Sequence, residues 1–110
     1  MSNTHMKTVF SDVLEANELR SFRYKLSNTN YQLKGLLHSN STELSISFQN
    51  QTELEIESLD TMLMDALELP PIKRIVSWEQ DLRNCAYITG TIRNLSQTKN
   101  IVNLYLILAT

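Results

Sequence analysis

The most apolar segment of the chain reads Ile101-Val102-Asn103-Leu104-Tyr105-Leu106-Ile107-Leu108-Ala109. Alternate side chains of a β-strand point to opposite faces, and this segment is apolar on both of them. One face carries Val102, Leu104, Leu106 and Leu108; the other carries Ile101, Tyr105 and Ile107, interrupted by Asn103. A strand of this kind is normally covered on both sides. We therefore expect the rest of the domain, or a second chain, to cover it on each face.

Length and composition are typical of one small globular domain. The chain has 110 residues, 42% of them hydrophobic and 20% charged, and its formal charge is −2. That charge gives no general attraction to nucleic acid or to anionic membranes, so we expect no membrane partner. Cys85 is the single cysteine, which favours a reducing, cytoplasmic location. We expect residues 1–6 to be disordered or a cloning remnant, and residues 7–110 to form a single α+β domain.

The N-terminal region shows a helical spacing of apolar residues. Between Thr8 and Arg20, the apolar side chains recur at intervals of three and four residues; they are Val9, Phe10, Val13 and Leu14. This pattern predicts an amphipathic helix of about three turns.

From Ser21 onward the apolar spacing changes to two, which is typical of strands. Four alternating segments are separated by turns rich in Asn, Ser and Thr, and they predict a four-stranded antiparallel meander over residues 21–58. The expected cross-strand pairs are Leu26 with Tyr31, Tyr24 with Leu33, Phe22 with Gly35, Phe48 with Leu54 and Ile46 with Ile56.

A second helix is predicted from Ser58 to Leu69, ended by the Pro-Pro pair that follows. The alternative is one long helix over residues 52–69, which a Thr52-x-x-Glu55 capping box supports. Three further antiparallel strands are predicted at residues 72–79, 85–94 and 101–109, the last two paired with each other. The expected fold class is therefore α+β: an N-terminal helix, a four-stranded meander, a second helix and three strands.

Catalytic and cofactor motifs are not found in the sequence. Outside the first six residues the only histidine is His38, and nothing near Cys85 in the sequence supports a Cys–His pair. Asp60, Asp65 and Glu68 lack the spacing of a metal-binding loop. We expect no enzyme activity, no cofactor and no metal; a reactive thiol at Cys85 is the alternative to test.

The charged residues are distributed unevenly. Between Gly35 and Ile72 there are seven acidic residues and no lysine or arginine. In the predicted meander, Arg23, Lys25 and Lys34 fall on the outer face of the first hairpin, and Glu53, Glu55 and Glu57 fall on the outer face of the last strand. Such a graded face protects a sheet edge from aggregation, or it complements a partner.

Two functions follow as hypotheses. The first is a small non-enzymatic module that binds proteins, itself included, as a homodimer whose interface contains Ile101, Tyr105 and Ile107. The charged face is then a second partner-binding surface. The alternative is a single-stranded nucleic-acid-binding protein that uses the basic part of that face.

Overall fold

The computed structural model describes residues 4–26, 32–50, 55–63, 75–83 and 85–109. These residues form eight β-strands and no helix. The strands are β1 (Thr4–Leu14), β2 (Leu19–Lys25), β3 (Gln32–His38), β4 (Thr42–Gln49), β5 (Glu55–Leu63), β6 (Val76–Asp81), β7 (Tyr87–Asn94) and β8 (Asn100–Ala109). None of the described segments is a helix that could span a membrane.

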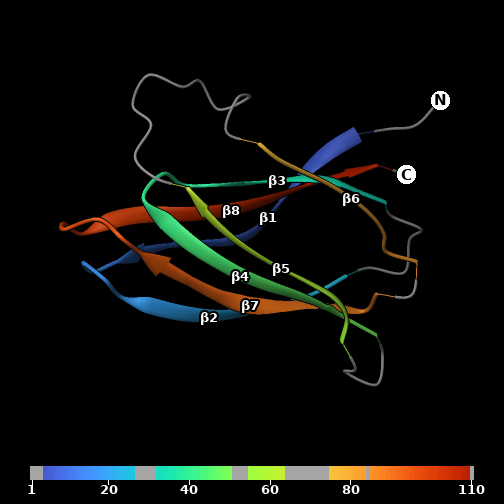
Figure 1. Ribbon diagram of the computed structural model, residues 1–110, viewed down its shortest axis with the longest axis horizontal. Helices are drawn as coiled ribbons and strands as arrows, with labels where there is room; N and C mark the ends of the chain where they lie inside the picture. Colours follow the sequence, from blue (N-terminus) through green and yellow to red (C-terminus); the bar gives the residue numbers. More distant parts are fainter. Residues whose placement is uncertain (1–3, 27–31, 51–54, 64–74, 84, 110) are drawn as a thin grey trace.

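The strands form two four-stranded antiparallel sheets that pack face to face (Figure 1). Sheet A has the order β1-β8-β3-β6, and sheet B has the order β2-β7-β4-β5. Successive strands alternate between the two sheets, except that β4 and β5 are neighbours in sheet B. Two such sheets with crossing connections form a jelly roll, a fold that serves many unrelated functions.

The core lies between the sheets. The inner row of β8 is buried in full, since Leu104, Leu106 and Leu108 are 0% exposed and Val102 is 1% exposed. Opposite them, sheet B contributes buried side chains from β4 and β7: Leu44, Ile46, Phe48, Ile88 and Ile92. The expectation that one face of residues 101–109 packs into the core is confirmed.

The predicted N-terminal helix over residues 8–20 is wrong, and the α+β fold class is wrong with it. β1 extends to Leu14, residues 15–18 make a tight turn, and β2 starts at Leu19. Asn17 has a φ of 61° in this turn, a left-handed conformation that asparagine tolerates better than most residues. β1 begins at Thr4, which pairs with Ala109 at the C-terminal end of β8.

A β-bulge explains why this strand has the apolar spacing of a helix. The register of β1 on β8 shifts between Thr8 and Phe10, so Val9 is an extra residue on β1. Val9 and Phe10 consequently both pack against the core, although they are adjacent in sequence. The alternation of the strand is broken at this point, and the spacing on either side of it imitates a helical period.

The predicted meander is wrong in its pairing. β2 pairs with β7, and β3 pairs with β8 and β6, so the first expected hairpin is split between the two sheets. β4 and β5 do pair, but Phe48 lies opposite Glu57 instead of Leu54; Leu54 and Tyr31 lie outside the described residues. The last two predicted strands, β7 and β8, are likewise in different sheets.

The predicted second helix is also wrong where it is described. Residues 58–63 continue β5, an edge strand of sheet B, and Leu59 packs against the core from it. The alternative of one long helix starting at residue 52 fails for the same reason. Residues 64–69, the rest of the predicted helix, lie outside the described residues.

Candidate interaction surfaces

The outer face of sheet A gathers apolar side chains from three strands. Residues opposite one another in neighbouring strands point to the same face of a sheet. Val13 lies opposite Ile101, and Met6 lies opposite Ile107. Leu37 of β3 lies opposite Tyr105. We call this surface the apolar face and define it as Met6, Val13, Leu37, Ile101, Tyr105 and Ile107.

Three members of the apolar face are strongly exposed for hydrophobic residues. Ile101 is 65% exposed, Met6 is 52% exposed and Val13 is 41% exposed. Tyr105, Ile107 and Leu37 are half-buried between them. Isolated exposed hydrophobic residues are ordinary, but several on one sheet face make that face a candidate interaction site.

Gly35 lets the apolar face close over β3, whereas a polar row formed by Ser11, Asn103 and Ser39 divides this face into two parts. Gly35 has no side chain where a Cβ would lie 3.0 Å from the Ile75 side chain and 3.7 Å from Ile107, so these two residues close over β3. Asn103, the polar residue in this row, accepts a hydrogen bond from the Ser11 hydroxyl at 2.6 Å, and its N–H donates to Ser39 Oγ at 2.9 Å. These polar groups of Asn103 therefore have partners within the chain.

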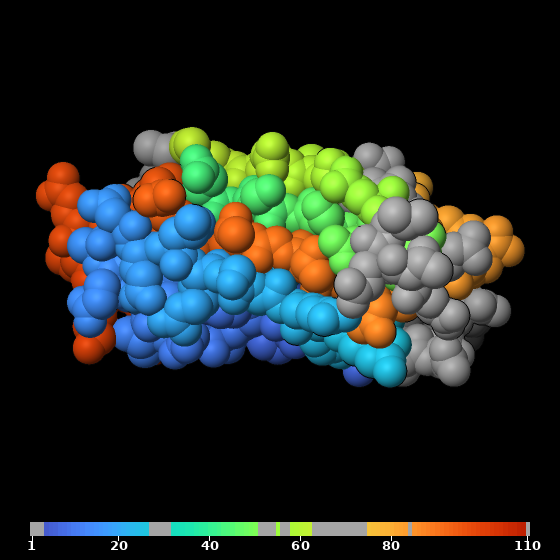
Figure 2. Space-filling view, turned by 90° about the horizontal axis from the view of Figure 1, so that it is seen from below, coloured from blue at the N-terminus to red at the C-terminus, as the bar shows by residue number. Residues whose placement is uncertain are grey.

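The outer face of sheet B is polar, and its charges are ordered across the strands. Figure 2 shows the four strands of this sheet side by side on one surface. Arg23 and Lys25 lie on β2 at one edge, and Glu55 and Asp60 are exposed on β5 at the other edge. The two central strands carry mainly hydroxyl groups: Thr89, Thr91, Ser45 and Ser47. We call the outer face of β2, β7, β4 and β5 the graded face.

An ion pair and a ring contact link neighbouring strands of the graded face. Arg93 of β7 and Glu43 of β4 are cross-strand neighbours with Nε and Oε1 4.0 Å apart. The Arg23 guanidinium lies over the Tyr87 ring, 4.3 Å from its centroid, in a cation–π contact. Both arrangements are solvent-exposed, and each adds little to folding stability.

The structure brings together part of the charged set that the sequence predicts. Arg23, Lys25 and Glu55 share the graded face. Lys34 lies on β3 in the other sheet, where its Nζ is 3.4 Å from Oε1 of Glu79. Glu57 belongs to β5, and Glu53 lies outside the described residues.

The hypothetical Cys85–His38 catalytic pair is ruled out by position. His38 lies next to the start of β4, where its Nδ1 is 2.6 Å from Oγ1 of Thr42. Cys85 lies at the other end of β4, because the N–H of the next residue, Ala86, donates to the Gln49 carbonyl. β4 has eight residues, roughly 25 Å at the rise of a strand. Burial also raises the pKa of the Cys85 thiol, which is the opposite of what activates a nucleophile.

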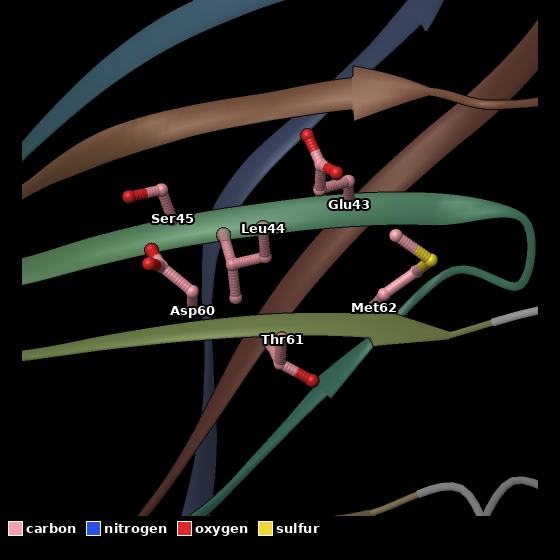
Figure 3. Close-up of a pocket in the computed structure, with 6 residues that line it drawn as sticks. All are labelled: Glu43, Leu44, Ser45, Asp60, Thr61 and Met62. Carbon is pink, nitrogen blue, oxygen red and sulfur yellow. The ribbon is translucent and has the colours of Figure 1, made fainter.

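An open depression lies on the graded face between β4 and β5. Its lining residues are Glu43, Leu44, Ser45, Asp60, Thr61 and Met62, and Figure 3 shows them as sticks. Ser45 and Asp60 face each other across the two strands. Among the described residues, no group of three His, Cys, Asp or Glu side chains could hold a metal ion.

Sequence reasoning misses several residues of these two faces. On the apolar face it misses Met6, Val13 and Leu37; on the graded face it misses Leu19, Glu43, Asp60 and Met62. The alternating pattern marks each residue as facing in or out, but it does not say which strands are neighbours. That information arises from pairings far apart in the sequence, and no local signal carries it.

Comparisons with known proteins do not assign the chain to a family. No protein-family model matches the chain, and no curated protein is found as a relative. The function must therefore be argued from the two faces.

Proposed function

We propose that this protein is a non-enzymatic, cytoplasmic interaction module that forms homodimers through the apolar face. The observation that carries the proposal is the set of exposed residues Met6, Val13 and Ile101 on a sheet face that also carries Tyr105 and Ile107. A sandwich that worked alone would expose polar residues on both of its outer faces. In the described part of this chain, the outer face of sheet A exposes three large hydrophobic residues, whereas the graded face exposes two, Leu19 and Met62, both on its edge strands.

The size of the apolar face suits a dimer. Sheet A has four strands, and β8 has 10 residues. Standard strand spacings make its outer face roughly 19 Å by 33 Å, or about 600 Å². Stable interfaces bury about 800 Å² on each partner. A second copy that covers most of this face therefore comes close to the area of a specific dimer.

Single-stranded nucleic-acid binding has weaker support. Lys34 is separated from Arg23 and Lys25, and it already has Glu79 as a partner. On the graded face, the described cations are Arg23, Lys25 and Arg93, and the described carboxylates are Glu43, Glu55 and Asp60. Three carboxylates beside three cations repel phosphates about as strongly as the cations attract them.

Two matched double variants test the proposal. Met6→Ser with Ile101→Ser removes two exposed apolar side chains from the apolar face. Leu19→Ser with Met62→Ser removes two from the graded face, where Leu19 is 49% exposed and Met62 is 52% exposed. Sedimentation equilibrium in about 0.5 M salt suppresses contacts between charged surfaces, because the screening length is then only a few ångströms.

We expect the Met6/Ile101 variant to raise the dimer Kd at least tenfold, since each removed side chain is worth about 1 kcal/mol of apolar burial. The Leu19/Met62 variant should dimerise like the wild type under these conditions. At protein concentrations well below the wild-type dimer Kd, both should unfold at the wild-type urea concentration, because all four side chains are largely exposed in the single chain. Equal weakening by the two variants, or none by either, would contradict the proposal.

A further inference from the structure

The order of residues across the graded face makes it complementary to the same face of a second copy. Strand pairing arranges its side chains in four rows that cross β2, β7, β4 and β5 in turn. The rows are Lys25–Tyr87–Gln49–Glu55, Arg23–Thr89–Ser47–Ser58, Ser21–Thr91–Ser45–Asp60 and Leu19–Arg93–Glu43–Met62. In the first row a cation stands at the β2 end and a carboxylate at the β5 end. In the last row an exposed apolar residue stands at each end.

A two-fold axis parallel to the strands, between β7 and β4, makes each row face itself in reverse. β2 then lies over β5 of a second copy, and β7 lies over β4. In the first row, Lys25 faces Glu55 of the second copy. In the last row, Leu19 faces Met62 of the second copy, and Arg93 faces Glu43 of the second copy.

The two middle rows fit under the same operation. Ser21 faces Asp60 of the second copy, so a hydroxyl donor meets a carboxylate. Arg23 faces Ser58 of the second copy, with Asp60 in the adjacent row. The centre consists of small Ser and Thr side chains, which let two sheets approach closely. No row of the described face places like charges opposite each other.

The alternative two-fold axis, perpendicular to the strands within the face, is disfavoured by charge. It would place β2 over β2 and β5 over β5. It would also reverse the order of the rows, so Lys25 and Glu55 would face Leu19 and Met62 of the second copy without an opposite charge. Arg23 and Asp60 would each lie one row from the same residue of the second copy. Like charges across an interface are costly, so the charge order selects the strand-parallel axis.

The depression between β4 and β5 supports this arrangement. It lies under the position that β2 and β7 of the second copy occupy, and Met62 stands at its edge (Figure 3). Leu19 is 49% exposed and lies at the complementary position. Glu43 and Asp60 line the same depression, where the cations of the second copy arrive.

We infer that a second copy of this chain docks on the graded face about a two-fold axis parallel to the strands. This contact does not rest on the apolar face, which lies on the opposite side of the sandwich. Because the contact is mainly electrostatic, it weakens with salt, whereas an apolar contact does not. Where both faces are occupied, copies stack in a row through alternating contacts.

A charge-complementation experiment tests the inference. The full chain is examined by sedimentation equilibrium in about 20 mM salt, where charges act over about 20 Å or more. The samples are the wild type, Lys25→Glu, Glu55→Lys and an equal mixture of the two variants. Each variant alone places like charges opposite each other twice per pair of copies. In the mixture, every substituted side chain faces its opposite charge.

We expect the wild type to show an association step that is lost in about 0.5 M salt. Each single variant should raise the Kd of that step about tenfold. The mixture should restore it to near the wild-type value. Lys99→Glu is the matched control, because it makes the same charge change at an exposed position on the β7–β8 loop, outside the face.

Three results would overturn the inference: no salt-sensitive association of the wild type, no rescue in the mixture, or equal weakening by Lys99→Glu and Lys25→Glu. The last would show an effect of net charge alone. The dimer at the apolar face is tested separately, because its contact is measured at high salt and with the Met6/Ile101 and Leu19/Met62 variants.

Discussion

The two sheets are alike on their inner faces and opposite on their outer faces. Inside, Leu104 of sheet A and Leu44 of sheet B are both 0% exposed. Outside, sheet A exposes Met6, Val13 and Ile101, whereas sheet B exposes hydroxyl groups at its centre, with charged residues and the apolar pair Leu19 and Met62 on its edge strands. Folding requires only the inner faces to be apolar. The outer apolar residues of sheet A therefore indicate a requirement beyond folding.

Substitutions on the two similar inner faces should give the largest loss of folding stability. Leu104→Ala and Leu44→Ala remove the same side chain from opposite sides of one core. We expect each to lower the free energy of unfolding by about 2–5 kcal/mol, because burial is lost and a cavity remains. Urea unfolding at neutral pH measures both. A loss below about 1 kcal/mol at either position would show that the two sheets do not share a tightly packed core.

His38 of sheet A is a buried titratable residue, so it should make the free energy of unfolding depend on pH. Its side chain is 1% exposed. The Thr42 hydroxyl donates to the Ser39 carbonyl, so His38 Nδ1 carries the proton that it shares with Thr42 Oγ1. Nε2 is buried without a hydrogen-bond partner in the described part of the chain. Burial lowers the pKa of His38 from 6.5 to about 4.

The sign of the pH effect follows from this lowered pKa. The unfolded chain binds a proton at His38 below about pH 6.5, whereas the folded chain does not until about pH 4. Stability is therefore full above about pH 6.5 and falls as the pH decreases, by about 2.5 kcal/mol at about pH 4.5. His38→Leu should remove this decline in urea unfolding. A variant that loses stability as steeply as the wild type would contradict the assignment to His38.

The sequence predicts well which side chains of a strand face the core. It predicts poorly which strands are neighbours in a sheet. The alternation in Val102 to Leu108 identifies β8 and its buried row, because one face of each strand must enter the core. The same alternation cannot tell that β8 lies between β1 and β3. In a jelly roll, most consecutive strands belong to different sheets, so hairpin reasoning from Phe22, Tyr24 and Leu33 selects the wrong partner.

The two helices that the apolar spacing predicts have different structural causes. In β1, the bulge at Val9 places two adjacent apolar residues against the core. In β5, Leu59 faces the core while Met62 is exposed on the graded face. Both spacings resemble one face of a helix. Pairing with β8 stabilises β1 as a strand, and pairing with β4 does the same for β5. These are tertiary interactions, which the local spacing of apolar residues does not encode.

Part of the candidate interface can also be located from the sequence. The apolar character of a second strand face singles out Ile101, Tyr105 and Ile107, and the structure places them on the outside of sheet A. Their neighbours Met6 and Val13 escape this reasoning, because one belongs to the excluded N-terminus and the other to a predicted helix. The role of all five residues in assembly stays a prediction.

The mass of the wild-type chain in solution tests the central claim most directly. One chain has a mass of 12.7 kDa. Light scattering on the full chain at tens of micromolar, in about 0.5 M salt, measures the contact at the apolar face with charge contacts suppressed. We expect a mass about twice that of one chain. A mass of 12.7 kDa that does not rise with concentration would contradict the claim that the apolar face binds a second copy.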